Sequence, residues 1–162
     1  MARTEEATMS TPSPTRISAG MPADCRAQLM ELAREVNFDA GERLFHEGGH
    51  ADRFWVVRSG TVTLDAHVPG RRPAVIERLD SGELVGCSWL FKPYVWHLGA
   101  EATSPVRTYE FDAARVRLLM DADPRFGSAI ALWVADVLAH RLLAARVRLL
   151  DLYAPYGSGT QV

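Results

Sequence analysis

The stretch FDAGERLFHEGGHADRFWVVRSGTVTL, residues 38–64, decides the fold of this chain. Short apolar runs within it are separated by glycines, and the same spacing continues to residue 86. Runs of strand length bounded by glycine are typical of a compact β-sandwich or β-barrel. The glycines that mark these intervals are Gly41, Gly48, Gly49, Gly60, Gly70, Gly82 and Gly86.

The five residues His46 to His50, HEGGH, match the H-E-x-x-H pattern of zinc-dependent proteases. Two histidines four residues apart share a face only in a helix, and each glycine costs a helix about 1 kcal/mol relative to alanine. No apolar helical stripe flanks the motif, and a third ligand on a downstream helix is missing. We therefore expect Gly48 and Gly49 to form a turn, and we expect no zinc site.

Alternating apolar and polar residues beyond the motif predict further strands. The alternation over residues 61–68 is typical of a strand with one buried face. The sequence PGRRP, residues 69–73, predicts a turn, and residues 74–79 predict the partner strand of a hairpin. Residues 106–111 predict the last strand.

Both ends of the chain have the composition of disordered segments. Residues 1–21 are rich in Thr, Ser, Pro, Ala and Glu, and residues 154–162 contain two glycines and no core residues. Between them we expect one domain, residues 22–153. It begins with a helix, because Pro22 suits a first helical position and apolar residues recur at helical spacing. These apolar residues are Leu29, Leu32, Ala33 and Val36.

Two helices are predicted after the strands. Asp112 suits the N-cap of a short helix over residues 113–120, and Asp123 followed by proline predicts a long helix over about residues 124–153. The apolar stripe of the long helix is wider than the roughly 100° arc that one packing contact needs. An uncovered apolar face usually marks a partner site, so we expect a homodimer through this helix. The stripe is formed by Ile130, Val134, Val137, Leu138, Leu142, Ala145, Leu149 and Leu152.

The composition excludes several classes of function. The chain has 162 residues and a net charge of −2, without the basic footprint of a nucleic-acid binder. Two cysteines are too few for a disulfide framework, and the acidic N-terminus is not a secretory signal. The longest apolar run, residues 129–135, is too short to span a membrane. No serine–histidine–acid cluster or phosphate-binding loop indicates catalysis, so we expect a soluble cytoplasmic protein that is not an enzyme.

Taken together, these motifs closely resemble the cyclic-nucleotide-binding domain, the sensor module of the catabolite activator protein and its relatives. The resemblance covers about residues 22–152 and includes LDSGELVG, residues 79–86. It implies a mainly β fold with flanking helices: an eight-stranded jelly-roll-like β-barrel, a short N-terminal helix, a short helix and a long C-terminal helix. In DNA-binding regulators of this family a helix-turn-helix domain follows the long helix. Only nine residues follow it here, so we expect no direct DNA binding. The matching positions are Gly41, Glu42, Phe45, Glu47, Gly48, Ala51, Asp52, Val56, Val57 and Gly60.

The resemblance places a phosphate-binding cassette at GELVGCSWLFKPYVWHLGAEA, residues 82–102. It implies that backbone N–H groups face the phosphate, a glutamate accepts from the ribose hydroxyl and an arginine neutralises the phosphate. In this chain the glutamate position falls on Cys87, the arginine position near Trp96, and the small hydroxyl position on His97. The residues implied for the binding site are Gly82, Glu83, Leu84, Val85, Gly86, Cys87, Ser88, Trp96, His97 and Leu98.

The departures from the family pattern give several residues two interpretations. Trp89, Tyr94 and Trp96 could stack a planar ligand or fill the vacated pocket. Cys87 could be a ligand or redox thiol, but it suits a buried core position. His97 could contact an anion, but it suits a hydrogen-bonded structural position. A haem site formed by these two residues is a further alternative. On the long helix, the positions that meet the base fall near Ala145 and Arg146.

Two functions follow from the resemblance. The first is a stand-alone sensor or adaptor that binds cyclic AMP, cyclic GMP or another nucleotide-like ligand and signals through an unidentified partner protein. The second is a ligand-free interaction module of the same fold. The ribose-binding glutamate and the phosphate-binding arginine of the family are both missing here. The loss of each charged hydrogen bond reduces the binding free energy by about 1.5–3 kcal/mol, so we expect weak or absent binding of cyclic AMP.

Overall fold

The computed structural model describes residues 20–154. The expected N-terminal arm and C-terminal tail lie outside these residues, apart from Gly20, Met21 and Ala154. Met21, at the end of the expected arm, is 8% exposed and belongs to the core. The elements in this part of the chain are α1 (Ala23–Glu31), β1 (Arg34–Phe38), β2 (Arg43–Phe45), β3 (Arg53–Ser59), β4 (Val62–Ala66), β5 (Ala74–Leu79), β6 (Leu84–Val85), η1 (Ser88–Leu90), β7 (Gly99–Ala102), β8 (Val106–Asp112), α2 (Ala113–Ala122) and α3 (Pro124–Tyr153).

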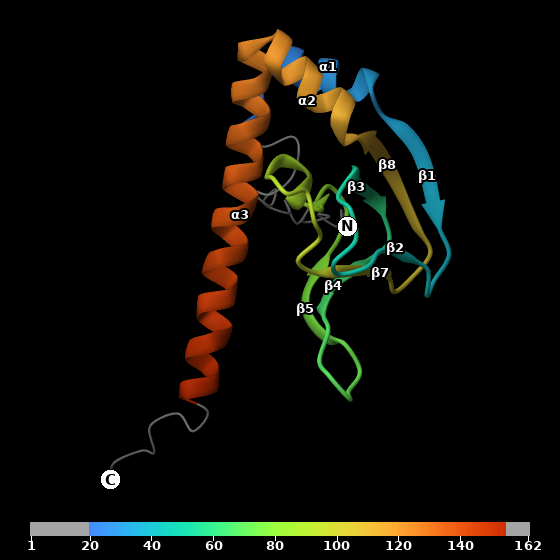
Figure 1. Ribbon diagram of the computed structural model, residues 1–162, viewed down its shortest axis with the longest axis vertical. Helices are drawn as coiled ribbons and strands as arrows, with labels where there is room; N and C mark the ends of the chain where they lie inside the picture. The colour runs from blue at the N-terminus through green and yellow to red at the C-terminus, as the bar shows by residue number, and fades with distance from the viewer. Residues whose placement is uncertain (1–19, 155–162) are drawn as a thin grey trace, which may run out of the picture.

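The strands form two four-stranded sheets. Helices α1 and α2 lie at one end of the sheets, and α3 runs along one side (Figure 1). One sheet has the order β1-β8-β3-β6 and the other β2-β7-β4-β5, and all pairings are antiparallel. The expected mainly β, jelly-roll-like fold with eight strands and flanking helices is confirmed. The sheets are not closed into a barrel. The edge strands β2 and β6 have only three and two residues, so they present few backbone groups with which a further strand could pair.

The first helix is shorter than the spacing of apolar residues predicted. It ends at Glu31, with Leu32 as its C-cap, and the chain then enters β1. Val36, expected on the helix, lies opposite Thr108 of β8. The Thr108 hydroxyl donates to the Val36 carbonyl oxygen over 2.8 Å. Sheet pairing with a distant strand therefore overrides the local helical pattern here.

The strand β4 was expected to have one buried face, and this was wrong. Thr63 and Asp65, on the face expected to be polar and open, are also buried. β4 lies between β7 and β5, and the Asp65 carboxylate accepts from Arg43 over 2.6 Å. An ion pair with an arginine of another strand thus allows the carboxylate to be covered.

Local signals for turns and caps are confirmed. β4 and β5 pair as the predicted hairpin. The Asp112 side chain accepts from the backbone N–H of Arg115 at the start of α2. The Asp123 side chain accepts from the backbone N–H groups of Arg125 and Phe126 at the start of α3, with proline at the first helical position. Each cap satisfies helix donors that would otherwise lack partners.

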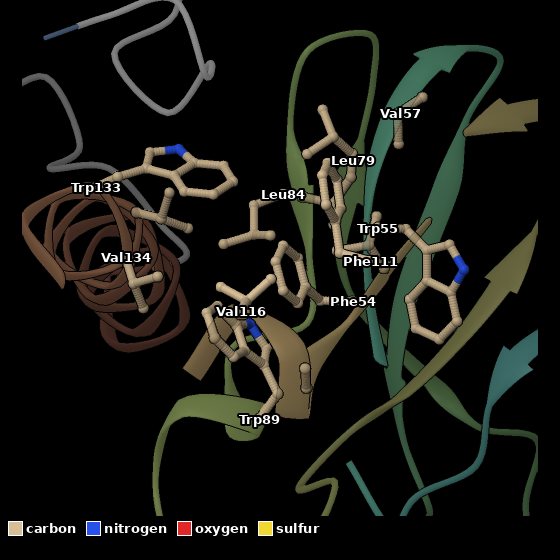
Figure 2. Close-up of a cluster of buried hydrophobic side chains, with 14 of the residues drawn as sticks. Phe54, Trp55, Val57, Leu79, Leu84, Trp89, Phe111, Val116, Trp133 and Val134 are labelled. Atoms are coloured by element: carbon tan, nitrogen blue, oxygen red, sulfur yellow. The ribbon is translucent and has the colours of Figure 1, made fainter. Parts of the chain in front are cut away.

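Aromatic side chains form the centre of the core between the sheets and the helices (Figure 2). The Phe54 ring stacks on Trp89 at 4.1 Å and on Phe111 at 4.8 Å between centroids. Trp133 and Val134 approach this cluster from α3 (Figure 2). The core thereby joins the first sheet, the 3-10 helix η1 and the N-terminal half of α3.

The two halves of α3 differ in burial. Phe126, Ile130, Trp133, Val134 and Val137 are buried, whereas the large apolar residues from position 138 onward are exposed. The helix is long and apolar enough to cross a membrane by length and composition alone, with 28% of its most apolar window buried. Because its N-terminal half packs into the domain core, that face is not available to lipid. The exposed apolar residues of the second half are Leu138, Leu142, Leu143, Val147, Leu149, Leu150, Leu152 and Tyr153.

We expect Gly60→Ala to destabilise the domain by about 2 kcal/mol or more. Gly60 has φ of +90°, and an added Cβ would clash with the Pro105 carbonyl oxygen. Gly70→Ala is the matched control, because Gly70 also has positive φ but no atom lies within 4 Å of the added Cβ. Urea unfolding of both variants measures the difference. A loss for Gly60→Ala no larger than that for Gly70→Ala would contradict the steric part of this prediction.

Candidate functional site

A cavity of about 280 Å³ lies between the second sheet, the segment after β6 and α3. We call it the cassette pocket. Its walls are mostly apolar, with a carboxylate, a thiol, a hydroxyl, an imidazole and a guanidinium among them. It is lined by Phe45, Leu64, Ile76, Glu77, Gly86, Cys87, Ser88, Trp96, His97, Leu98, Leu138 and Arg141.

Six of the ten site residues expected from the sequence line this pocket. They are Gly86, Cys87, Ser88, Trp96, His97 and Leu98.

The other four expected site residues precede the pocket rather than line it. Gly82 and Glu83 lie in the turn before β6, and Leu84 and Val85 form β6 itself. Leu84 and Val85 pair with β3 and bury their side chains in the core. Leu84 and Val85 therefore contribute to the pocket only by positioning the backbone of residues 86–88, which line it.

Trp96 is packed against Phe45 and Gly86. Its ring stacks on Phe45 with 3.8 Å between centroids and an interplanar angle of 13°. Gly86 lies against the edge of the same ring, where an added Cβ would stand 2.7 Å from the indole and 3.8 Å from the Phe45 ring. Gly86 has φ of +95°, so glycine is required there both for the backbone and for the close approach. Only part of Trp96 is left to face the cavity.

The HEGGH turn holds Trp96 in this position. Gly48 has φ of +85°, and the Gly49 N–H donates to the His46 carbonyl oxygen over 3.1 Å, so the turn prediction is confirmed. The Gly48 N–H donates to the Trp96 carbonyl oxygen, and the Trp96 N–H donates to Gly49. Among the described residues no group of three or more His, Cys, Asp or Glu side chains could hold a metal. Whether the chain binds zinc stays a prediction.

Trp89 and Tyr94, the other two aromatic residues expected to stack a ligand or fill the pocket, do not line it. Trp89 is fully buried, and its indole N–H donates to the Gly86 carbonyl oxygen over 3.1 Å. The Tyr94 ring lies under the Arg117 guanidinium, 4.1 Å from the ring centroid. Together with the packing of Trp96, these positions favour aromatic filling of the cassette over an open stacking platform.

Arg141 and Glu77 are pocket residues that the sequence did not identify. Arg141 of α3 donates to the Cys87 sulfur over 3.3 Å and to the Leu84 carbonyl oxygen. Its Nε lies 3.6 Å from the carboxylate of Glu77 on β5. The helix thus reaches the pocket through Leu138 and Arg141, whereas the positions expected to meet a base, near residues 145 and 146, are exposed.

Burial controls the ionisation of the two acidic groups next to Arg141. Desolvation raises the pKa of the Cys87 thiol, and the nearby guanidinium offsets this only in part. Desolvation also raises the pKa of the Glu77 carboxyl, again opposed by Arg141. A thiol with a raised pKa is a weak nucleophile, so Cys87 suits a packing residue rather than a reactive one.

A larger cavity, of about 680 Å³, lies between the start of the described chain and α3. It contains no cassette residue, and both of its charged groups have partners. Arg125 pairs with Asp24 at 3.2 Å, and Asp136 lies 3.5 Å from His140. The cassette pocket therefore remains the stronger candidate for a ligand site, because polar and charged groups from β5, from the cassette and from α3 converge there.

Comparison with known proteins gives matches to one family. Residues 35–123, more than half of the chain, match the model of the cyclic nucleotide-binding domain. A CRP-like cAMP-activated global transcriptional regulator from Mycobacterium tuberculosis is 25% identical over 136 residues, covering 84% of this chain and 59% of the relative. This chain thus spans less than two thirds of that relative's length.

Two solved structures show the same fold. The catabolite activator protein of Thermus thermophilus has a TM-score of 0.67 at 22% identity and covers 87% of this chain, with 63% of its own length aligned. The c-di-GMP responsive global regulator CLP of Xanthomonas campestris has a TM-score of 0.73 at 18% identity, with 82% and 65% covered. At these identities the likeness concerns the fold alone.

Proposed function

Because this chain belongs to the cyclic nucleotide-binding domain family, we propose that it is a sensor domain whose cassette pocket binds a small nucleotide-like ligand. The functional unit is residues 22–153, with Met21 added to its core. Occupancy of the pocket is passed to a partner protein through α3. Cyclic AMP, cyclic GMP or a related nucleotide is the expected class of ligand.

The observation that carries this proposal is the position of the pocket. It lies where the segment after β6 meets α3, so a bound molecule would touch both the sheets and the helix. Arg141 already links these parts, from α3 to the Leu84 carbonyl oxygen and to Cys87. A ligand that changes these contacts would change how α3 is held, which is what a sensor domain needs.

The second candidate, a ligand-free interaction module, is favoured by the packing of Trp96. Phe45 covers one face of the indole ring, and Gly86 lies against its edge. An aromatic side chain that fills the family's pocket leaves the fold intact while removing the space for a base. In that case the domain would present surfaces, above all α3, without responding to a nucleotide.

Assembly and location follow the family in this proposal. We propose a homodimer through α3, as its exposed apolar second half requires a partner. We further propose a cytoplasmic, non-catalytic regulatory protein. The raised pKa of the Cys87 thiol suits packing better than chemistry and supports the non-catalytic role.

Thermal unfolding in the presence of candidate ligands separates the two functions. The panel contains cyclic mononucleotides, cyclic dinucleotides, ordinary nucleotides and haem. A ligand present at one hundred times its dissociation constant would stabilise the domain by about 2.7 kcal/mol, a shift of several degrees. We expect stabilisation by a cyclic mononucleotide. If no compound raises the unfolding temperature even at millimolar concentration, the ligand-free module is correct instead.

A further inference from the structure

We infer that Arg141 and Glu77 together recognise the ligand of the cassette pocket, and that this ligand carries an oxyanion such as phosphate beside a hydroxyl group. The inference rests on the proposed function, because it concerns the same pocket. Among the described residues that line the pocket, Arg141 is the only Arg or Lys and Glu77 the only Asp or Glu. These two side chains therefore decide which charged ligand can enter.

Arg141 has hydrogen-bonding capacity to spare. A guanidinium has five N–H donors and stays charged at every physiological pH. One donates to the Leu84 carbonyl oxygen and one to the Cys87 sulfur, which is a weak acceptor. The Nε–carboxylate distance of 3.6 Å to Glu77 is beyond a normal hydrogen bond. A phosphate could thus replace weak contacts with a bidentate, charge-assisted pair.

The surroundings make such a contact strong. The Arg141 side chain is 15% exposed, and Leu138 of the same helix forms the adjacent wall. A charged hydrogen bond is stronger in a partly dry site than in water, because the local dielectric is lower. An oxyanion would also supply a negative charge near the guanidinium beside that of Glu77.

Glu77 supplies the matching acceptor. Its carboxylate projects from β5 into the same pocket and is 22% exposed. An ionised carboxylate only accepts hydrogen bonds, so its suitable partner on a ligand is a hydroxyl or amino group. Burial raises the pKa of this carboxyl, so a donor that stabilises the ionised form would bind favourably. Oxyanion and hydroxyl must then lie side by side on the ligand, as they do on a ribose phosphate.

The size of the pocket limits the ligand further. A volume of about 280 Å³ is slightly below the usual range of ligand sites, about 300–1,000 Å³. This favours a ligand of the size of a cyclic mononucleotide over a cyclic dinucleotide. The apolar lining by Leu64, Ile76 and Leu98 suits the uncharged part of such a molecule. Glu77 of β5 and Arg141 of α3 thus supply the carboxylate and the guanidinium that are missing at the positions of Cys87 and Trp96.

Titration calorimetry with charged and neutral probes tests the inference. Cyclic AMP and cyclic GMP are compared with adenosine and guanosine on the wild type, Arg141→Gln, Glu77→Gln and Arg146→Gln. Arg146 is the matched control, since it lies exposed on the same helix and does not line the pocket. We expect a cyclic mononucleotide to bind weakly, above micromolar. The corresponding nucleoside should bind the wild type about tenfold more weakly or worse. The Arg141→Gln and Glu77→Gln variants should each lose about tenfold or more in affinity for the cyclic nucleotide, whereas Arg146→Gln should bind it like the wild type.

The outcomes separate this inference from the proposed function. A nucleoside that binds as tightly as its cyclic phosphate, or full binding by folded Arg141→Gln, would overturn the inference and leave the sensor function standing. Circular dichroism checks folding, and Arg141→Lys, which keeps the charge but loses the planar fork, should give intermediate binding. Absence of binding by every probe at millimolar concentration would overturn both.

Discussion

A Leu142→Glu/Leu149→Glu variant will be a monomer at concentrations where the wild-type chain is a dimer. Both leucines are about half exposed in the single chain, at 54% and 53%. They belong to a set of α3 residues spaced alternately by four and three positions, the pattern of a coiled-coil seam. A glutamate placed in that seam would be a buried charge without a partner, at a cost of about 3–5 kcal/mol. The seam residues are Leu138, Leu142, Ala145, Leu149 and Leu152.

The matched control is Leu143→Glu/Leu150→Glu. These two leucines are also exposed, at 61% and 67%, but they lie about 100° around the helix from the seam. We expect this variant to remain dimeric in light scattering at concentrations on the order of tens of micromolar. A wild-type monomer under these conditions would exclude the dimer, and a Leu142→Glu/Leu149→Glu dimer would exclude this seam.

Trp89→Ala will destabilise the domain by about 3–5 kcal/mol, a large part of the stability of a typical single domain. The side chain is fully buried and stacks on Phe54 at 4.1 Å. Its indole N–H donates to the Gly86 carbonyl oxygen, so the truncation also leaves that buried acceptor without its partner. The cavity would open next to the backbone that forms one wall of the cassette pocket.

Phe91→Ala is the control for this substitution. Phe91 is another aromatic residue of the cassette, two positions further on, but it is 52% exposed. We expect its truncation to change the free energy of unfolding by less than about 1 kcal/mol. Urea unfolding followed by circular dichroism measures both variants. Similar losses for the two would show that Trp89 is not a central core residue.

The parts of the fold that depend on neighbouring residues were predictable from the sequence. The turn at Gly48, the hairpin of β4 and β5, and the caps at Asp112 and Asp123 are each specified within a few positions. Positive φ at a glycine and a side-chain cap are local requirements that residue type reveals directly. The resemblance of the glycine spacing to a known family then supplied the jelly-roll-like class of the fold and the flanking helices.

Features that depend on distant residues were not predictable. Val36 has helical spacing, but β8 recruits it into a sheet. Asp65 looks like a solvent-facing strand residue, but Arg43 covers it. Arg141 lies 54 positions from Cys87 in the sequence, so a count along the cassette could not reveal the guanidinium beside the thiol. Only the packing of α3 against the sheets brings these groups together.

The division of α3 into a buried half and an exposed half also makes the helix a lever. Residues 138–153 extend about 24 Å from the last buried turn, at about 1.5 Å per residue. For a rigid arm of that length, a tilt of about 10° at the buried end moves the free end by about 4 Å. Arg141 lies near the buried end of this exposed half, where its guanidinium donates to the Leu84 carbonyl oxygen and to the Cys87 sulfur. A change of a fraction of an ångström at the guanidinium is therefore magnified several-fold at Tyr153, the last residue of the helix.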